Sequence, residues 1–427
     1  MSSRSKVVTA KGGIMKALGP GFLFAAVSVG VSHVVQSTRA GAGYGFSLLW
    51  VIVLALLLKY PLFEFGQRYA AATGNSLLEG YRRQGKWSLV LYLILTVGTM
   101  FTVLAAVTAV TAGLAIQMTA LTLPLAAWSA IIIAACVLIL IIGRYPLLDK
   151  VIKVVMALLV VSTVAATIVV LPKLKGASLW GPVRLIDVAF IVGLVGWMPT
   201  GMDVSVWQSF WTLARKKETG CTPTLKASLF DFNLGYIATG ALALMFCTLG
   251  TAVMFDKGMT FQSSSAAFAG QVIDLYTSTL GSWSRPIIAI SAFTTIFSTV
   301  LTVVDGFPRG LQLVARRFRT PEDPVDVLER SGNSWDYWLW MGIMAVGAML
   351  IIAFYLKSLK ALVDLATTLS FITGPFLGFL TYRAITAKYV PAECRPAPWL
   401  RGLAVLGIVF LGGFLLFFIY YRLFMGN

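Results

Sequence analysis

The side chains best able to bind a ligand lie in two short stretches that interrupt long apolar runs. The first reads Ser28-Val-Gly30-Val-Ser32-His33-Val-Val-Gln36-Ser37, and the second reads Gly196-Trp-Met198-Pro-Thr200-Gly-Met-Asp203-Val-Ser205. Glycine loosens a helix, and proline removes a backbone N–H donor. Both stretches therefore predict broken helices, whose freed backbone groups can bind an ion or a polar solute where lipid could not satisfy them.

We expect substrate to bind where the two broken helices meet. The candidate substrate-binding residues are Gly30, His33, Gln36, Val195, Met198, Thr200 and Asp203. Asp203 is the strongest candidate, because an ionisable side chain inside a hydrophobic segment is costly and usually functional. Thr200-x-x-Asp203 also fits a capping box, a structural role that is compatible with binding. His33, the only histidine, could equally hydrogen-bond across a helix interface.

The elements that must hold these stretches are transmembrane helices. Of the 427 residues, 58% are hydrophobic and only 12% are charged, and the mean hydropathy is +0.85. A bilayer core needs about 20 apolar residues per helix. We expect an all-α membrane protein with eleven spans, at about 19–41, 45–68, 88–118, 122–143, 149–171, 185–213, 226–254, 284–307, 336–356, 361–384 and 400–422.

The spans form one transmembrane domain over residues 1–427. Polar connections at 256–283 and 308–335 are the longest, so no soluble domain remains. Gly/Pro-interrupted spans at corresponding places in two halves are typical of transporters built from inverted repeats. We therefore predict repeats at about 19–171 and 185–384, with discontinuous helices 1 and 6 and one extra helix at about 400–422.

The basic residues set the expected orientation. A net charge of +17 would favour nucleic-acid binding in a soluble protein, but here the charges lie in short connections between spans, which excludes that function. With the N-terminus inside, 24 of the 34 lysines and arginines fall on the cytoplasmic side. Positive residues favour that side, so we expect a cell (inner) membrane protein with a cytoplasmic N-terminus and an external C-terminus.

Several classes of function have no support in the sequence. We find no nucleophile-and-base set, no phosphate-binding glycine loop and no Cys/His cluster, so an enzyme or an ATP-driven pump has no support and no cofactor is expected. The cysteines lack paired or metal-type spacing and read as packing residues or free thiols: Cys136, Cys221, Cys247 and Cys394. The expected partners are a transported ion or small solute and the lipid bilayer, with no obligatory protein partner.

Other ionisable residues in or near the spans have simpler explanations. Glu64 and Arg68 are four residues apart and predict an ion pair on one helix face. Asp305 is expected to bind Arg309 or a neighbouring backbone group, and Asp231 and Asp364 to favour their own helix N-termini. Lys59 lies deeper without an evident partner, and snorkelling and a functional role remain open for it.

Six short motifs recur at the spacing of a known family: Gly19-Pro20-Gly21-Phe22, Gly45-Phe-Ser-Leu-Leu-Trp50, Ala72-Thr73-Gly74, Met198-Pro199, Gly281-Ser-Trp and Val303-Val-Asp305-Gly-Phe307. Through these motifs the chain resembles the natural-resistance-associated macrophage protein (Nramp) family of divalent-metal transporters over most of its length. This resemblance implies the leucine-transporter-like fold, with an inverted 5+5 repeat and alternating access.

The sequence differs from the family at the residues that bind metal and carry protons in it. The signature Asp-Pro-Gly-Asn of span 1 aligns with Gly30-Val31-Ser32-His33, and Thr200 stands at the position of the span-6 histidine. Span 3 carries an acidic proton path in the family, but here it has no Asp, Glu or His between Trp87 and Ala120. Asp203, on a family tyrosine position about one turn beyond the break, is the nearest replacement for the missing carboxylate.

Two cargoes therefore remain open. The resemblance implies a divalent cation held by His33, Met198 and Asp203, with freed carbonyls around Gly30 and Val195 completing an atypical shell that suits a transition metal. The alternative is a small organic solute without a conventional metal site or proton coupling. In that case Asp203 would meet a cationic group, and His33, Gln36 and Thr200 would hydrogen-bond the solute.

Overall fold

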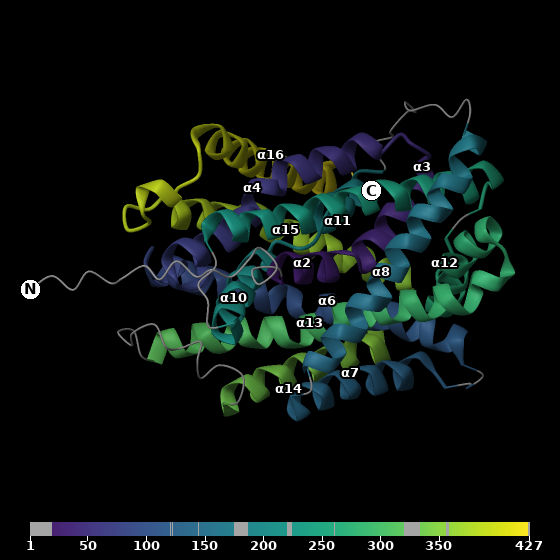
Figure 1. Ribbon diagram of the computed structural model, residues 1–427, viewed down its shortest axis with the longest axis horizontal. Helices are drawn as coiled ribbons and strands as arrows, with labels where there is room; N and C mark the ends of the chain where they lie inside the picture. The colour runs from purple at the N-terminus through teal and green to yellow at the C-terminus, as the bar shows by residue number, and fades with distance from the viewer. Residues whose placement is uncertain are drawn as a thin grey trace, which may run out of the picture.

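The computed structural model describes residues 19–425, apart from 120, 122, 144, 175–186, 220–223, 260, 320–333 and 356–357. The described chain is almost entirely helical, and its long helices run side by side as one bundle (Figure 1). Eight helices are long and apolar enough to cross a membrane: α4 (Leu49–Thr73), α6 (Lys86–Met118), α7 (Leu125–Ile142), α11 (Leu225–Val253), α13 with its leading turn (Ser282–Arg319), α14 with its last turn (Trp335–Phe354), α15 (Leu359–Thr386) and α16 (Pro398–Phe424).

The remaining predicted spans are shorter or broken. The bent pair of helices at Pro20–Ser28 and Ser32–Tyr44 makes a ninth crossing by the same criteria. Predicted spans 5 and 6 correspond to α8 (Tyr145–Val170) and α9 (Val188–Trp197). Length and composition thus support nine crossings in the described part of the chain, and the full count of eleven stays a prediction.

The first predicted break is confirmed. Helix α2 (Pro20–Ser28) ends two residues before Gly30, and the chain continues at an angle of 45° as a π-helical turn (Ser32–Ser37) and α3 (Thr38–Tyr44). Gly30 lies against α13, where an added Cβ would come within 2.5 Å of the Thr299 hydroxyl oxygen. A side chain at Gly30 would therefore push the break away from α13.

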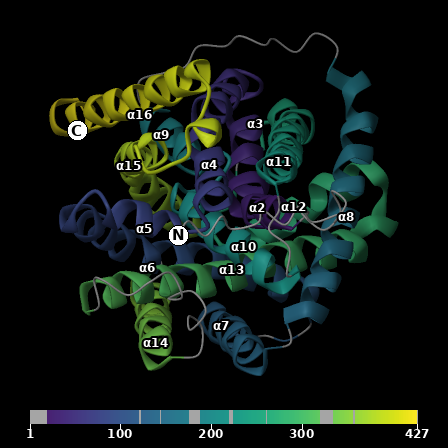
Figure 2. The same ribbon diagram turned by 60° about the vertical axis from the view of Figure 1, so that its left-hand side comes forward.

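The second predicted break is confirmed as well. Helix α9 ends at Trp197, Met198 is extended, and α10 (Asp203–Thr219) begins after Pro199, Thr200 and Gly201. Because proline cannot donate to the preceding turn, the helix stops where the sequence places Met198-Pro199. In Figure 2 both α2 and α10 lie inside the ring formed by the longer helices, so the two breaks meet within the bundle.

Helix α2 is held against α11 by backbone contact. An added Cβ at Gly21 would come within 2.0 Å of the Asp231 carbonyl oxygen, and one at Gly235 within 2.1 Å of the Gly21 carbonyl oxygen. The Asp231 carboxylate also accepts hydrogen bonds from the backbone N–H groups of Gly19 (3.1 Å) and Gly21 (2.6 Å). Asp231 therefore caps α2 rather than its own helix, which corrects the sequence-based expectation.

The connections contain more structure than the sequence predicted. The 256–283 connection holds α12 (Ser265–Leu280), capped by the Ser264 hydroxyl, and α5 (Leu77–Arg82) follows α4. Helix α13 extends to Arg319, well past the predicted end at 307. A helix of moderate polarity is missed when apolar length is the main criterion.

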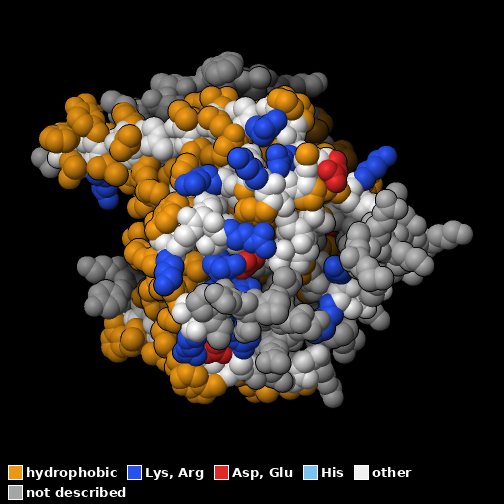
Figure 3. Space-filling view, turned by 90° about the vertical axis from the view of Figure 1, so that its left-hand side faces the viewer, with side chains coloured by type: hydrophobic (Ala, Val, Ile, Leu, Met, Phe, Trp, Pro, Cys, Tyr) orange, Lys and Arg blue, Asp and Glu red, His pale blue; other side chains and the backbone are white. Residues whose placement is uncertain are grey.

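Basic side chains gather at one end of the bundle, the end that faces left in Figure 1 and the viewer in Figure 3. The predicted Glu64–Arg68 pair is confirmed at 2.5 Å, and the Asp305–Arg309 pair at 2.6 Å. Glu79 pairs with Arg82, Arg83 and Arg317 and so ties α5 to α13. Burial raises the pKa of Glu79, but the surrounding arginines outweigh it and the net pKa is lowered.

The orientation gives the first testable prediction. A cysteine introduced into the 256–283 connection should be labelled by an impermeant thiol reagent added to intact cells, whereas Cys221, which lies outside the described residues, should not. A matched labelling after permeabilisation shows that Cys221 is reactive when reached. Labelling of Cys221 in cells proved to be intact would reverse the predicted orientation.

Candidate functional site

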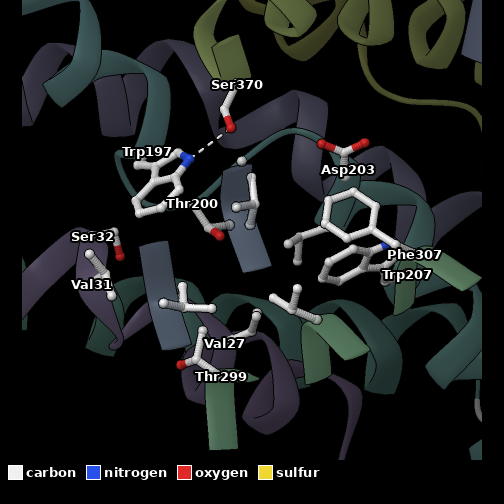
Figure 4. Close-up of a pocket in the computed structure, with 15 residues that line it drawn as sticks. Val27, Val31, Ser32, Trp197, Thr200, Asp203, Trp207, Thr299, Phe307 and Ser370 are labelled. Carbon is white, nitrogen blue, oxygen red and sulfur yellow. Dashed lines mark hydrogen bonds between the residues drawn. The ribbon is translucent and has the colours of Figure 1, made fainter. Parts of the chain in front are cut away.

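A small cavity lies where the two breaks meet (Figure 4). Its volume is about 40 Å³, which is room for a few waters or one partly hydrated ion. Its walls come from α2, the turn after it, α6, α9, α10, α13 and α15. The polar lining residues are Ser32, Thr200, Asp203, Thr299 and Ser370.

Asp203 is the only charged side chain among the described residues that line the cavity. It is 3% exposed, and its buried Oδ1 atom has no hydrogen-bond partner in the part of the chain that the structure describes. As the first residue of α10 it lies at the positive end of that helix, which offsets part of the cost of burying a carboxylate. The rest of that cost has to be offset by a cation or by protonation of the carboxylate, since buried charges are normally paired or neutralised.

The space beside Asp203 is kept open by Gly201. A Cβ added at Gly201 would meet nothing closer than the Asp203 Oδ2 and Ser370 Oγ atoms, each at 3.9 Å. These two oxygens, from α10 and α15, therefore face one small gap in the break. Carboxylate and hydroxyl oxygens are ligands that hard divalent cations accept, together with retained water.

Three aromatic side chains lie in the cavity wall together with six valines. Trp197, the last residue of α9, donates from Nε1 to the Ser370 hydroxyl at 2.8 Å, the dashed line in Figure 4. Trp207 packs edge-on against Phe307 with ring centroids 4.9 Å apart. Because valines and aromatic rings make up most of the wall, the polar contacts of a ligand must come from the five polar lining residues.

His33 does not line the cavity. Its Nε2 atom lies 3.0 Å from the Thr239 carbonyl oxygen on α11, and its Nδ1 atom lies 2.8 Å from Ser32 Oγ. A carbonyl can only accept, so Nε2 must carry the proton and donate. The imidazole therefore bridges two helices, which is the structural role that the sequence left open for it.

The other predicted residues divide between the cavity and its surroundings. Thr200 lines the cavity with Asp203, whereas Gly30 packs on Thr299 and Met198 is fully buried outside the cavity wall. The Val195 carbonyl already accepts a hydrogen bond, from Lys59 Nζ at 3.0 Å. The structure thus brings together two of the seven predicted site residues.

Gln36 belongs to a separate polar group. Its amide oxygen accepts from Arg39 Nη1 at 2.8 Å, and the same guanidinium pairs with Asp364 at 2.7 Å while lying 4.9 Å from the centroid of the Phe190 ring. Asp364 was expected to stabilise its own helix N-terminus, but it joins α15 to α3 instead. In the sequence, Arg39 lies near the end of a predicted span and contributes only to the topology signal. Its partner Asp364 is 325 residues away, so no local sequence pattern predicts the pair.

Comparison with known proteins places the chain in a family. A family model described as natural resistance-associated macrophage protein-like matches residues 21–421. The chain belongs to the Nramp family. An uncharacterized protein of Pasteurella multocida is 32% identical over 417 residues, covering 94% of this chain and 92% of the relative.

Solved structures agree on the fold. A manganese transporter of Eremococcus coleocola, crystallised with an aromatic bis-isothiourea compound, matches with a TM-score of 0.66 at 15% identity, over 96% of this chain and 88% of its own. MhsT in complex with L-phenylalanine matches with a TM-score of 0.59 at 15% identity, over 92% and 98% of the two chains. The leucine-transporter-like fold with broken helices 1 and 6 is thereby confirmed for this Nramp protein.

Membership of the Nramp family and the apolar helices make this chain an integral membrane protein. They place it among transporters rather than enzymes. The departures at Gly30-Val31-Ser32-His33 also take on physical meaning, because Ser32 from this segment faces the cavity while His33 faces α11.

Proposed function

We propose that this protein is a secondary-active transporter that moves a divalent cation by alternating access, through an atypical site centred on Asp203. The observation that carries the proposal is the buried Asp203 carboxylate, at a helix break inside the bundle, with an unpartnered oxygen. Such a group is expensive in a membrane protein unless a cation uses it. Transport of a metal ion is what the family relationship favours, and the cavity admits a small, partly hydrated ion.

The available donors define the kind of metal ion. Asp203, Thr200, Ser32 and Ser370 offer oxygen ligands, while His33 and Met198 lie outside the cavity wall. Among the described residues, no three His, Cys, Asp or Glu side chains come together as a ready-made metal site. One carboxylate with hydroxyls and water suits an oxygen-loving ion such as Mn²⁺ or Mg²⁺ better than a softer one.

A small organic solute is the second candidate, and the aromatic wall favours it. Trp197, Trp207 and Phe307 lie in the wall of the same cavity as Asp203. An ammonium group could pair with Asp203 and lie against these rings, since aromatic faces attract cations. The cavity would have to open beyond its present size to admit more than the smallest amine.

Titration calorimetry on the purified parent protein tests the proposal. Mn²⁺, Mg²⁺, Ca²⁺ and methylammonium are titrated in turn, and saturable heat with a divalent ion is expected. The same titration of Asp203→Asn should give none, whereas Asp274→Asn, at an exposed ion pair with Arg285, should behave as the parent. Heat with methylammonium alone would favour the organic solute, and divalent binding untouched by Asp203→Asn would remove the proposed site.

A further prediction concerns coupling. Helix α6 corresponds to span 3, which by resemblance to the Nramp family would carry an acidic proton path. Between Trp87 and Ala120, however, the sequence has no Asp, Glu or His. We expect cation uptake into proteoliposomes to proceed without stoichiometric acidification of the lumen, measured with an internal pH dye. Stoichiometric acidification that depends on the cation would contradict this and leave Asp203, Glu64 or His33 as the proton relay.

A further inference from the structure

Lys59 is buried in the middle of α4 and points its ammonium at the second helix break. Lys59 is only 1% exposed. Its Nζ atom donates to the carbonyl oxygens of Val195, Gly196 and Thr200, each at 3.0 Å. Val195 and Gly196 belong to the last turn of α9, and Thr200 lies in the break. One cation thus joins both sides of the interruption.

The match between donors and acceptors is complete. The last turn of a helix leaves carbonyl oxygens without partners, and these carry the negative end of the helix dipole. An ammonium group has three N–H donors, and here three carbonyls receive them. The Phe63 ring, one turn further along α4, lies with its centroid 5.6 Å from Nζ. Lys59 is surrounded by oxygen and aromatic groups in the way a bound small cation would be.

Among the described residues, no carboxylate forms an ion pair with Lys59, so its positive charge is stabilised by the three backbone carbonyls and the Phe63 ring. A buried charge held only by carbonyl dipoles is the arrangement that unwound helix ends provide for transported or coupling cations in this class of fold. In this chain the cation is covalently attached to the neighbouring helix.

We propose that the Lys59 ammonium is a tethered cation that permanently fills a monovalent-cation site built from the carbonyls of Val195, Gly196 and Thr200. This site is separate from the Asp203 cavity, and the inference does not depend on the cargo proposed above. Filling it has two consequences. The Val195 carbonyl is withdrawn from any metal shell, and the Thr200 backbone is fixed so that Thr200 and Asp203 stay on the cavity wall.

A lysine that fills a cation site and a lysine that only fills volume respond differently to a free amine. If the lysine occupies a cation site, removing the whole side chain in Lys59→Ala leaves a cage of three carbonyls that a small free amine can refill. Lys59→Met keeps most of the stem, so its end occupies the space without supplying donors. A lysine that served only to fill volume would be replaced well by methionine, and neither variant would respond to amines.

Thermal unfolding of the purified full-length protein, followed by tryptophan fluorescence without divalent ions, tests this. Lys59→Ala and Lys59→Met should both unfold roughly 5 °C below the parent. Methylammonium chloride should restore at least half of that loss for Lys59→Ala, in a saturable manner and beyond choline chloride at the same ionic strength. It should leave the parent and Lys59→Met unchanged, and Lys360→Ala, on the exposed start of α15, should match the parent throughout.

Two results would overturn the tethered cation. One is a Lys59→Met protein as stable as the parent, and the other is an equal response of all variants to methylammonium and choline. If Lys59→Ala can be purified only with amine present, loss of folded protein on dialysis into choline chloride supports the proposal. Recovery of no folded Lys59→Ala protein even with methylammonium would count against it. Because methylammonium is also the probe of the Asp203 cavity, all Lys59 and Lys360 variants are compared in an Asp203→Asn background, which keeps these outcomes independent of the Asp203 experiments.

Discussion

Uptake of the transported cation into proteoliposomes is expected to be lost when Asp203 is replaced by asparagine. The substitution keeps the shape of the side chain and an oxygen near the start of α10, but removes the only charge among the described residues of the cavity wall. Loss of one buried charge from a cation site costs about 3 kcal/mol, which corresponds to an affinity lower by on the order of 100-fold. Uptake at cation concentrations that half-saturate the parent should therefore fall to background.

Matched variants separate this effect from damage to the fold. Asp274→Asn removes a carboxylate that is paired with Arg285 at an exposed position, and it should transport like the parent. Gly201→Val leaves the charge but fills the gap between Asp203 and Ser370, so it should also lose uptake. Parent-like uptake by a well-folded Asp203→Asn protein would show that the cation binds elsewhere.

The second large effect is expected at the contact between α2 and α11. Gly235→Ala adds a Cβ that would lie 2.1 Å from the Gly21 carbonyl oxygen, so the two backbones must separate. Overpacking against backbone is expected to cost about 3 kcal/mol of unfolding free energy. The shift also moves Gly21 away from the Asp231 carboxylate that caps α2, and α2 carries Val27 on the cavity wall.

Gly98→Ala provides the control for that substitution. Gly98 lies within α6, where an added Cβ meets nothing within 4 Å, so alanine should leave stability unchanged or raise it by up to about 1 kcal/mol through helix propensity. The stabilities of Gly235→Ala and Gly98→Ala are compared by their unfolding temperatures in the same detergent. Equal stability of Gly235→Ala and Gly98→Ala would contradict the close approach of α2 and α11.

The elements of this fold can be predicted because they depend on local sequence. The apolar runs have the length that a bilayer requires, and Gly30 and Met198-Pro199 interrupt them where the helices do break. Ion pairs four residues apart, such as Glu64–Arg68, follow from helix geometry alone. These features need no knowledge of the neighbouring helices.

The candidate site could be predicted only in part, because it depends on how each helix is rotated. Successive residues of a helix point about 100° apart, so Ser32 faces the cavity while His33 beside it faces α11. The partners of Lys59 lie 136 to 141 residues away, and Asp364 lies 325 residues from Arg39. No local pattern reports such pairings, and backbone acceptors carry no side-chain signature at all.

The most direct test of the Asp203 site is anomalous diffraction from crystals of the parent protein soaked in Mn²⁺. The expected result is an anomalous peak in the gap beside Gly201, within coordination distance of an Asp203 carboxylate oxygen and absent from Asp203→Asn crystals treated in the same way. Density for an organic molecule in that gap would instead favour the small organic solute as the transported substrate. A manganese peak elsewhere in the bundle, with the Asp203 carboxylate unligated, would contradict the site proposed here.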